Sequence, residues 1–239
     1  MTPTLHQRQY KILSGSVLKL LAIITMTIDH AAIILLPVVG ALRLPITFLG
    51  TTKSVYWLLR KIGRLAFPIF CFLIAQGYQH TRNKWKYGLR LLIFAVVSEI
   101  PFDLMCTGKL WSLEHQNVYF TLFMGLAMIF AYENINGQLR KYLAMAAIGL
   151  VATYLKADYG LNGVLLVFLL HWLRQVPAVQ ALLAYPLLSG GAAAFAAFIP
   201  INLYNGERGF IKGPVLKWLF YIFYPLHMVV LLAIQHLLK

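Results

Sequence analysis

Long apolar runs constrain this chain of 239 residues more than any other feature of its sequence. A helix needs about 20 apolar residues to cross the hydrocarbon core of a bilayer, and about 17 to 25 are tolerated. By that measure the sequence contains eight candidate spans, which are Ser16–Val39, Ile62–Tyr78, Tyr87–Met105, Asn117–Tyr132, Leu139–Leu155, Leu161–Arg174, Ala178–Ile199 and Val215–Leu238. The sixth span is short, and a re-entrant or broken helix fits it as well. The pattern predicts an all-α, polytopic integral membrane protein of about eight transmembrane helices.

The composition supports this fold class and excludes a typical water-soluble enzyme. Hydrophobic residues make up 60% of the chain and charged residues 12%, whereas a soluble domain carries about 25% charged residues. Lysine and arginine number 21 against 7 acidic residues. The basic residues lie in the short gaps between apolar runs, which is typical of membrane topology signals rather than of a nucleic-acid-binding surface. Cys71 and Cys106 predict neither a disulfide framework nor a metal site.

The short connections predict a single helical membrane domain over residues 1–239, with no internal repeat. Residues 1–15 form a short N-terminal segment before the first span. Residues 45–59 are semi-apolar but are interrupted by Gly50, Thr51, Thr52 and Lys53. This interruption favours an interfacial segment over a membrane crossing.

Asp29 and His30 lie near the middle of the first span. An ionisable side chain at the centre of a membrane helix costs about 2.5–3.5 kcal/mol on insertion scales, so each one needs a partner or a function. A packed, hydrogen-bonded pair that orders helices would explain both residues. An aspartate next to a histidine in a long apolar helix favours a functional role.

Charged side chains also mark the second and third spans. Arg60 and Lys61 are explained by snorkelling to the headgroups, whereas Arg64 lies deeper and fits either a structural ion pair or an anion-binding role. Glu99 and Asp103 are four residues apart and therefore share a helical face. Arg64 is expected on the same membrane side and is a candidate counter-ion for them. A structural salt-bridge cluster and direct chemistry both remain open for these carboxylates.

Polar side chains follow one face of the last span. Lys217, Tyr221, Tyr224 and His227 are spaced by four, three and three residues, and an aromatic belt would explain the tyrosines but not the histidine. In a serpentine chain the odd-numbered connections share one membrane side, called here the odd side. The polar residues expected at or near it are Arg64, Glu99, Asp103, Asn117, Asp158, Arg208, Lys217 and His227. We therefore predict one polar intramembrane cavity, which the acid and histidine of the first span approach from mid-membrane.

Six segments together resemble the TraX family. They are LKLLAIITMTIDHAA, RKIGRLAFPIFCFLIAQGYQHT, KYGLRLLIFAVVSEIPFD, DYGLNG, YNGERG and KWLFYIFYPLH. Each segment alone is weak evidence, but the joint pattern is specific and runs in family order from about Leu18 to His227. Members of this family are multi-spanning membrane proteins linked to N-terminal acetylation of conjugative pilin.

The resemblance implies an acyltransferase of the bacterial inner (cytoplasmic) membrane that takes acetyl groups from acetyl-coenzyme A and uses no metal. The acceptor is open among a pilin N-terminus, a sugar, a lipid and a small amine. Acetyl transfer needs a base near neutral pKa, donors for the oxyanion and stabilisation of the leaving thiolate. His30 is the expected base or acyl carrier, with Asp29 or a third-span carboxylate to orient it, and His227 is the second candidate base.

The expected substrate side combines cations with hydrogen-bonding groups. Arg64, Lys217 and Tyr224 are candidate partners of the oxyanion or the thiolate. The other residues assigned to the substrate side are Glu99, Asp103, Asn117 and Asp158.

A basic cluster on the opposite, even side is expected to meet the coenzyme phosphates. It consists of Arg82, Lys84, Lys86 and Arg90. Positive-inside topology alone also predicts such a cluster. The competing class of function is a non-enzymatic transporter or pilus-assembly protein with a proton-binding or ion-binding cavity, because buried ionisable residues also mark ion paths.

Overall fold

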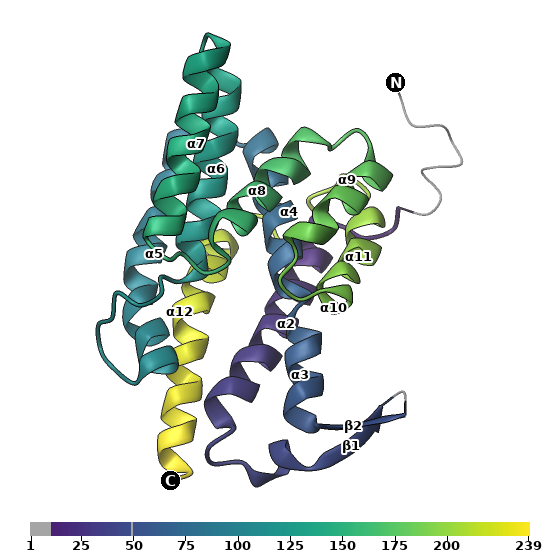
Figure 1. Cartoon of the computed structure of the whole chain (residues 1–239), viewed down its shortest axis with the longest axis vertical. Helices are drawn as coiled ribbons and strands as arrows, with labels where there is room; N and C mark the ends of the chain where they lie inside the picture. Colours follow the sequence, from purple (N-terminus) through teal and green to yellow (C-terminus); the bar gives the residue numbers. More distant parts are fainter. Residues whose placement is uncertain (1–10, 49) are drawn as a thin grey trace. The chain divides into compact units, whose positions relative to one another are not determined.

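The computed structural model describes residues 11–48 and 50–239, with only the backbone of Phe48, Pro214 and Lys217. Helices dominate the described chain (Figure 1). The longer helices are α2 (Gly15–Leu35), α3 (Val55–Gly63), α4 (Ala66–His80), α5 (Lys84–Thr107), α6 (Val118–Asn134), α7 (Gln138–Tyr154), α8 (Gly160–Trp172) and α12 (Pro214–Leu237). The all-α prediction is confirmed.

The chain forms two compact units. Unit 1 contains the chain up to Phe70 together with Ala192–Lys239, and unit 2 contains Cys71–Gly191. The boundary at Phe70 falls within the sequence of α4. The expectation of a single domain over 1–239 stays a prediction, and each unit is described below by itself.

Two of the described helices are long and apolar enough to cross a membrane, by length and composition. They are Gly15–Leu35 and the Trp218–Leu237 part of α12. Three other apolar stretches are shorter, namely Val118–Asn134, Gly160–Trp172 and Ala192–Asn202. The count of eight crossings therefore stays a prediction.

Two predicted spans were wrong as continuous helices. The second span, Ile62–Tyr78, is interrupted between α3 and α4, because Pro68 has no N–H donor and is best placed in the first turn of a new helix. The seventh span, Ala178–Ile199, is broken into four short pieces. These are α9 (Pro177–Ala184), η2 (Tyr185–Leu187), α10 (Ala192–Phe195) and α11 (Phe198–Asn202). Pro186 and the left-handed Gly191, with φ of 57°, explain the main break.

The interrupted segment 45–59 contains a hairpin. Strand β1 (Pro45–Phe48) pairs antiparallel with β2 (Thr51–Ser54), with Pro45 opposite Ser54, and a 3-10 turn, η1 (Gly40–Arg43), precedes it. Ser54 then caps α3, because its hydroxyl accepts a hydrogen bond from the backbone N–H of Trp57 at 3.2 Å. The interfacial position of this segment stays a prediction.

In unit 1, α2 packs against both α3 and α12. Gly63 makes the first contact close, since a Cβ atom at this position would lie 2.3 Å from Cβ and Oδ1 of Asp29. The absence of a side chain at Gly63 therefore lets α3 approach α2 at the level of the predicted functional residues.

The first turn of α2 is fastened to the YNGERG segment of unit 1. The hydroxyl of Ser16 donates to the carbonyl of Arg208 at 2.7 Å and accepts from the N–H of Ile211 at 2.8 Å. Gly209 has φ of 81°, and a Cβ there would lie 2.3 Å from Oγ of Ser14, the N-cap residue of α2. The geometry of this turn thus depends on a glycine at position 209.

In unit 2, α6 packs against α5, α7 and α8 (Figure 1). Buried Met128, Ala152 and Val164 form a core cluster at the meeting of α6, α7 and α8. Gly125 permits close packing of α6 on α8, because a Cβ at this position would lie 2.5 Å from Cβ of Val167. These contacts pack α6, α7 and α8 around one buried core cluster of unit 2.

Candidate functional site

The central feature of unit 1 is a pair of histidines. Nδ1 of His30 on α2 lies 2.7 Å from Nε2 of His227 on α12. Nδ1 of His227 is 2.9 Å from the backbone carbonyl oxygen of Phe223, one turn earlier in the same helix. His227 is buried and His30 is half-buried. The two predicted bases therefore form one hydrogen-bonded unit.

Asp29 is paired with a cation and not with the histidine beside it. Nη1 of Arg60 on α3 lies 2.5 Å from Oδ2 of Asp29. Arg64, the C-cap residue of α3, also acts on this carboxylate electrostatically. Arg60 is thus held by Asp29 across the helix contact, and its snorkelling to the headgroups stays a prediction.

Tyr224 lies beside the two histidines. Its ring centroid is 6.1 Å from that of His30, edge to face, and 5.8 Å from that of His227. Tyr224 is buried, as expected for the helix face it shares with His227. Lys217 belongs to the same helix, but its side chain lies outside the described residues.

In unit 2, Glu99 anchors the start of α6. Its Oε1 accepts a hydrogen bond from the backbone N–H of Asn117 at 2.9 Å and another from the Asn117 side-chain amide. The same amide donates to the carbonyl of Ala95 at 2.7 Å, and Oδ1 of Asn117 caps α6 by accepting from the N–H of Tyr119 at 3.0 Å. Glu99 is 2% exposed and Asn117 is 0% exposed. This network fits the structural reading of Glu99 better than direct chemistry.

Asp103 holds the same connection one turn later. Its Oδ2 accepts a hydrogen bond from the backbone N–H of Ser112 at 2.7 Å, and its side chain is buried. Asp158 lies in the connection between α7 and α8, where its N–H donates to the carbonyl of Gln116 at 2.8 Å. Its own carbonyl accepts from the hydroxyl of Thr121. Asp103 therefore ties the α5–α6 connection to α5, and the backbone of Asp158 ties the same connection to the one between α7 and α8.

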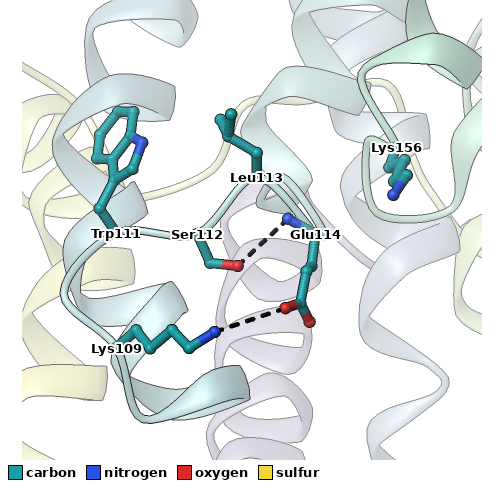
Figure 2. A pocket seen from close by; sticks show the side chains of 6 residues that line it. All are labelled: Lys109, Trp111, Ser112, Leu113, Glu114 and Lys156. Carbon is teal, nitrogen blue, oxygen red and sulfur yellow. Dashed lines mark hydrogen bonds and ion pairs between the residues drawn. The ribbon is translucent and has the colours of Figure 1, made fainter.

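A pocket of about 490 Å³ opens among these connections (Figure 2). It is lined by Lys109, Trp111, Ser112, Leu113, Glu114 and Lys156. Nζ of Lys109 is 3.8 Å from Oε1 of Glu114, and the N–H of Glu114 donates to the hydroxyl of Ser112 at 3.2 Å. The lining contains none of the predicted site residues, and it is a surface hollow with exposed lysines.

In the predicted coenzyme cluster, two cations are exposed and two contact tyrosine residues of the protein. Arg82 and Lys86 are exposed. Lys84 donates to the carbonyl of Tyr78, and its Nζ lies 4.3 Å from the centroid of the Tyr78 ring. The guanidinium of Arg90 lies 5.8 Å from the centroid of the Tyr87 ring. Two of the four cations are therefore held by protein groups, which leaves Arg82 and Lys86 as the better candidates for phosphate contacts.

Unit 2 contains a histidine–carboxylate pair, with a buried histidine and an exposed glutamate, that was not predicted from the sequence. Nε2 of His171, near the end of α8, lies 2.8 Å from Oε1 of Glu133, near the end of α6. His171 is 2% exposed, and its Nδ1 has no hydrogen-bond partner among the residues that the structure describes. A signal was present, because Glu133 and His171 lie at the ends of their predicted spans on the same expected membrane side.

The predicted polar residues thus gather in two places. Asp29, His30, Arg64, Tyr224 and His227 belong to unit 1, and the first two pair with Arg60 and His227 respectively. Arg208 and Lys217 also belong to unit 1, whereas unit 2 contains Glu99, Asp103, Asn117 and Asp158. A single cavity joining both sets stays a prediction, as does the counter-ion role of Arg64 toward Glu99 and Asp103. Among the described residues no group of three or more His, Cys, Asp or Glu side chains is arranged to hold a metal.

Two of the described helices are long and apolar enough to cross a membrane, and they bring a histidine pair together, which fits a helical membrane protein. The family model described as TraX protein matches residues 14–235. The chain therefore belongs to the TraX family, and the resemblance found in the sequence is confirmed.

Two curated proteins are similar to the chain. One is "Probable fimbrial assembly protein FimC, serogroup H1" of Dichelobacter nodosus, 28% identical over 252 aligned positions that cover 93% of this chain and 96% of that protein. The other is "Uncharacterized protein RP591" of Rickettsia prowazekii (strain Madrid E), 26% identical over 117 positions, 49% of this chain and 37% of that protein. No solved structure matches the chain.

Proposed function

We propose that the protein is a multi-pass inner-membrane acetyltransferase that moves an acetyl group from acetyl-coenzyme A to an acceptor, with His30 at the reacting centre. The observation that carries the proposal is the hydrogen bond between His30 and His227 at 2.7 Å in otherwise apolar helices. A pair of imidazoles provides a base and an orienting partner, which acyl transfer requires. The family resemblance supplies the reaction class.

The proposed reaction has three steps. An N–H or O–H group of the acceptor attacks the thioester carbonyl while His30 takes its proton. The new carbon–nitrogen or carbon–oxygen bond forms, and the carbon–sulfur bond then breaks. The leaving thiolate takes the proton from His30 and departs as coenzyme A thiol. In the two-step variant a nitrogen of His30 attacks the thioester carbonyl, and the carbon–sulfur bond breaks to release the thiolate. The acceptor then attacks the acetyl group on His30, the bond to His30 breaks, and the acceptor's proton passes to the thiolate.

Nearby groups are suited to stabilise the developing charge. Tyr224 lies against both imidazoles, and its hydroxyl is a candidate oxyanion donor together with Arg64. Arg82 and Lys86 are exposed cations suited to the coenzyme phosphates. Because the relative from Dichelobacter nodosus is a probable fimbrial assembly protein, a pilin-like N-terminal amine is the first acceptor to test.

The deciding experiment is acetyl transfer by the purified protein from radiolabelled acetyl-coenzyme A. The acceptors are a peptide with a free N-terminus, a sugar, a phospholipid amine and a small amine. We expect transfer to one of them and its loss in His30→Ala. The matched control is His236→Ala, because His236 is an exposed histidine of the same helix as His227. Undiminished transfer by His30→Ala would exclude His30 as the base.

A non-enzymatic pilus-assembly or transport function is the second candidate. It is favoured by the name of the relative, which refers to assembly and to no reaction, and by buried ionisable pairs, which also occur on proton paths. Absence of thioester turnover with every acceptor, combined with a pilus defect in cells that lack the protein, would favour this function over acetyl transfer.

A further inference from the structure

We infer that His227 is a positioning residue that holds His30 in the tautomer with the proton on Nδ1, so that Nε2 of His30 is the basic nitrogen. The inference rests on the proposed function for its catalytic meaning. The proton positions in the hydrogen-bond chain from His30 through His227 to the carbonyl of Phe223 can be measured without an activity assay.

The direction of the chain follows from its last member. A backbone carbonyl only accepts hydrogen bonds, so the 2.9 Å contact with the oxygen of Phe223 requires a proton on Nδ1 of His227. In a neutral imidazole the other nitrogen then has a lone pair. Nε2 of His227 is therefore an acceptor, and Nδ1 of His30, 2.7 Å away, must be the donor. The remaining nitrogen of His30, Nε2, keeps its lone pair.

The orientation of the rings supports a true hydrogen bond. The two imidazole planes differ by only 9°, and their centroids are 4.9 Å apart. With the nitrogens at 2.7 Å, these values place the rings side by side, nearly in one plane, as donation along a ring N–H requires. The Phe223 ring lies parallel to His227 at 5.1 Å and restricts its rotation.

The carboxylate next to His30 is not available for this role. Asp29 is directed to Arg60 at 2.5 Å, so the usual acid partner of a catalytic histidine is replaced by a second, neutral histidine. A neutral partner places no negative charge beside His30 in an apolar helix pair, where an unpaired carboxylate would be costly. When Nε2 takes a proton from the acceptor, the Nδ1–H bond to His227 is retained and strengthened.

The first test is the tautomer of His30, measured by nitrogen-15 NMR of the purified full chain in detergent with labelled histidine. His30→Asn identifies the His30 signals. We expect a protonated Nδ1 and an unprotonated Nε2 in the neutral state. His227→Leu removes the acceptor and should produce both tautomers, whereas His227→Gln keeps an acceptor oxygen and should preserve the native one. A protonated Nε2 in the native protein would overturn the inference.

The second test is acetyl transfer by the same variants, each first shown to be folded by its thermal unfolding midpoint. We expect kcat to fall at least about tenfold in His227→Leu, with KM for acetyl-coenzyme A unchanged, and to recover in His227→Gln. Equal loss in both variants would contradict the positioning role. If the native protein transfers no acetyl group, the proposed function fails, and the tautomer measurement still decides whether His227 orients His30.

Discussion

Asp29 and Arg60 form an ion pair across the contact of α2 with α3, with Oδ2 and Nη1 2.5 Å apart. Adjacent residues on a helix differ in direction by about 100°, so this pair turns Asp29 away from the side of α2 on which His30 meets His227. Gly63 makes the approach of α3 possible. The result is a neutralised carboxylate beside a histidine pair that carries no fixed charge.

Arg60→Met should destabilise the protein by about 2 kcal/mol, because it leaves the Asp29 carboxylate without its cation. The two side chains are only 22% and 16% exposed, so the value lies between those of exposed and fully buried pairs. The measurement is the free energy of unfolding in detergent.

The control for this pair is Lys61→Met, because Lys61 follows Arg60 and contacts the Trp57 ring with Nζ 5.5 Å from its centroid. We expect the double variant Asp29→Asn with Arg60→Met to be more stable than Arg60→Met alone. If the changes in unfolding free energy of the two single variants add up to that of the double variant, the two side chains are not coupled.

Gly63→Ala should destabilise unit 1 by about 1–3 kcal/mol, because its new Cβ atom would lie 2.3 Å from Asp29. Gly40→Ala is the comparison, since a Cβ at Gly40 would meet no described atom within 4 Å. The thermal unfolding midpoints of the two variants provide the check. Equal midpoints would contradict the close helix contact.

Gly209→Ala should cost more than Gly206→Ala, although both glycines have positive φ, 81° and 85°. Both substitutions carry the cost of the left-handed conformation, about 1–2 kcal/mol. Only the Cβ at position 209 would collide, at 2.3 Å from Oγ of Ser14, which adds about 1–3 kcal/mol. Hydrogen exchange at the first turn of α2 should accelerate in the 209 variant alone, and similar exchange in both would refute this attachment.

Asn117→Ala should destabilise unit 2 by about 2–3 kcal/mol, since it removes the cap of α6 and leaves the buried Glu99 carboxylate short of a donor. Asn117→Ser restores the cap acceptor alone and should recover about 1 kcal/mol. Denaturant unfolding of the three proteins measures this order. If Asn117→Ser is no more stable than Asn117→Ala, the loss of the α6 N-cap does not account for the destabilisation.

Replacing Arg82 and Lys86 together by alanine should raise KM for acetyl-coenzyme A about tenfold and leave kcat unchanged, if these exposed cations meet the coenzyme phosphates. Lys84→Ala should instead lower thermal stability, because Lys84 is bound to Tyr78. High salt should reduce the difference in KM between the native and double-variant proteins. A fall in kcat without a change in KM would assign the cations another role.

Helix positions were predictable where the apolar pattern was long and uninterrupted. The first, third, fourth, fifth and last spans agree with α2, α5, α6, α7 and α12 to within a few residues. The prediction of the seventh span as one helix was wrong, because apolar composition does not reveal the N–H donor missing at Pro186 or the turn at Gly191. Hydropathy measures the transfer of side chains, whereas helix continuity depends on backbone hydrogen bonds.

The sequence by itself determined the helical class, the family and the candidate site residues, because burying an ionisable side chain in an apolar run is costly whatever the fold. Only the tertiary structure decided which of them meet. Asp29 pairs with Arg60, while His30 bonds to a histidine 197 positions away. Spacing along one helix gives the direction of a side chain, but the partner depends on which helices pack together and how closely a glycine such as Gly63 lets them approach.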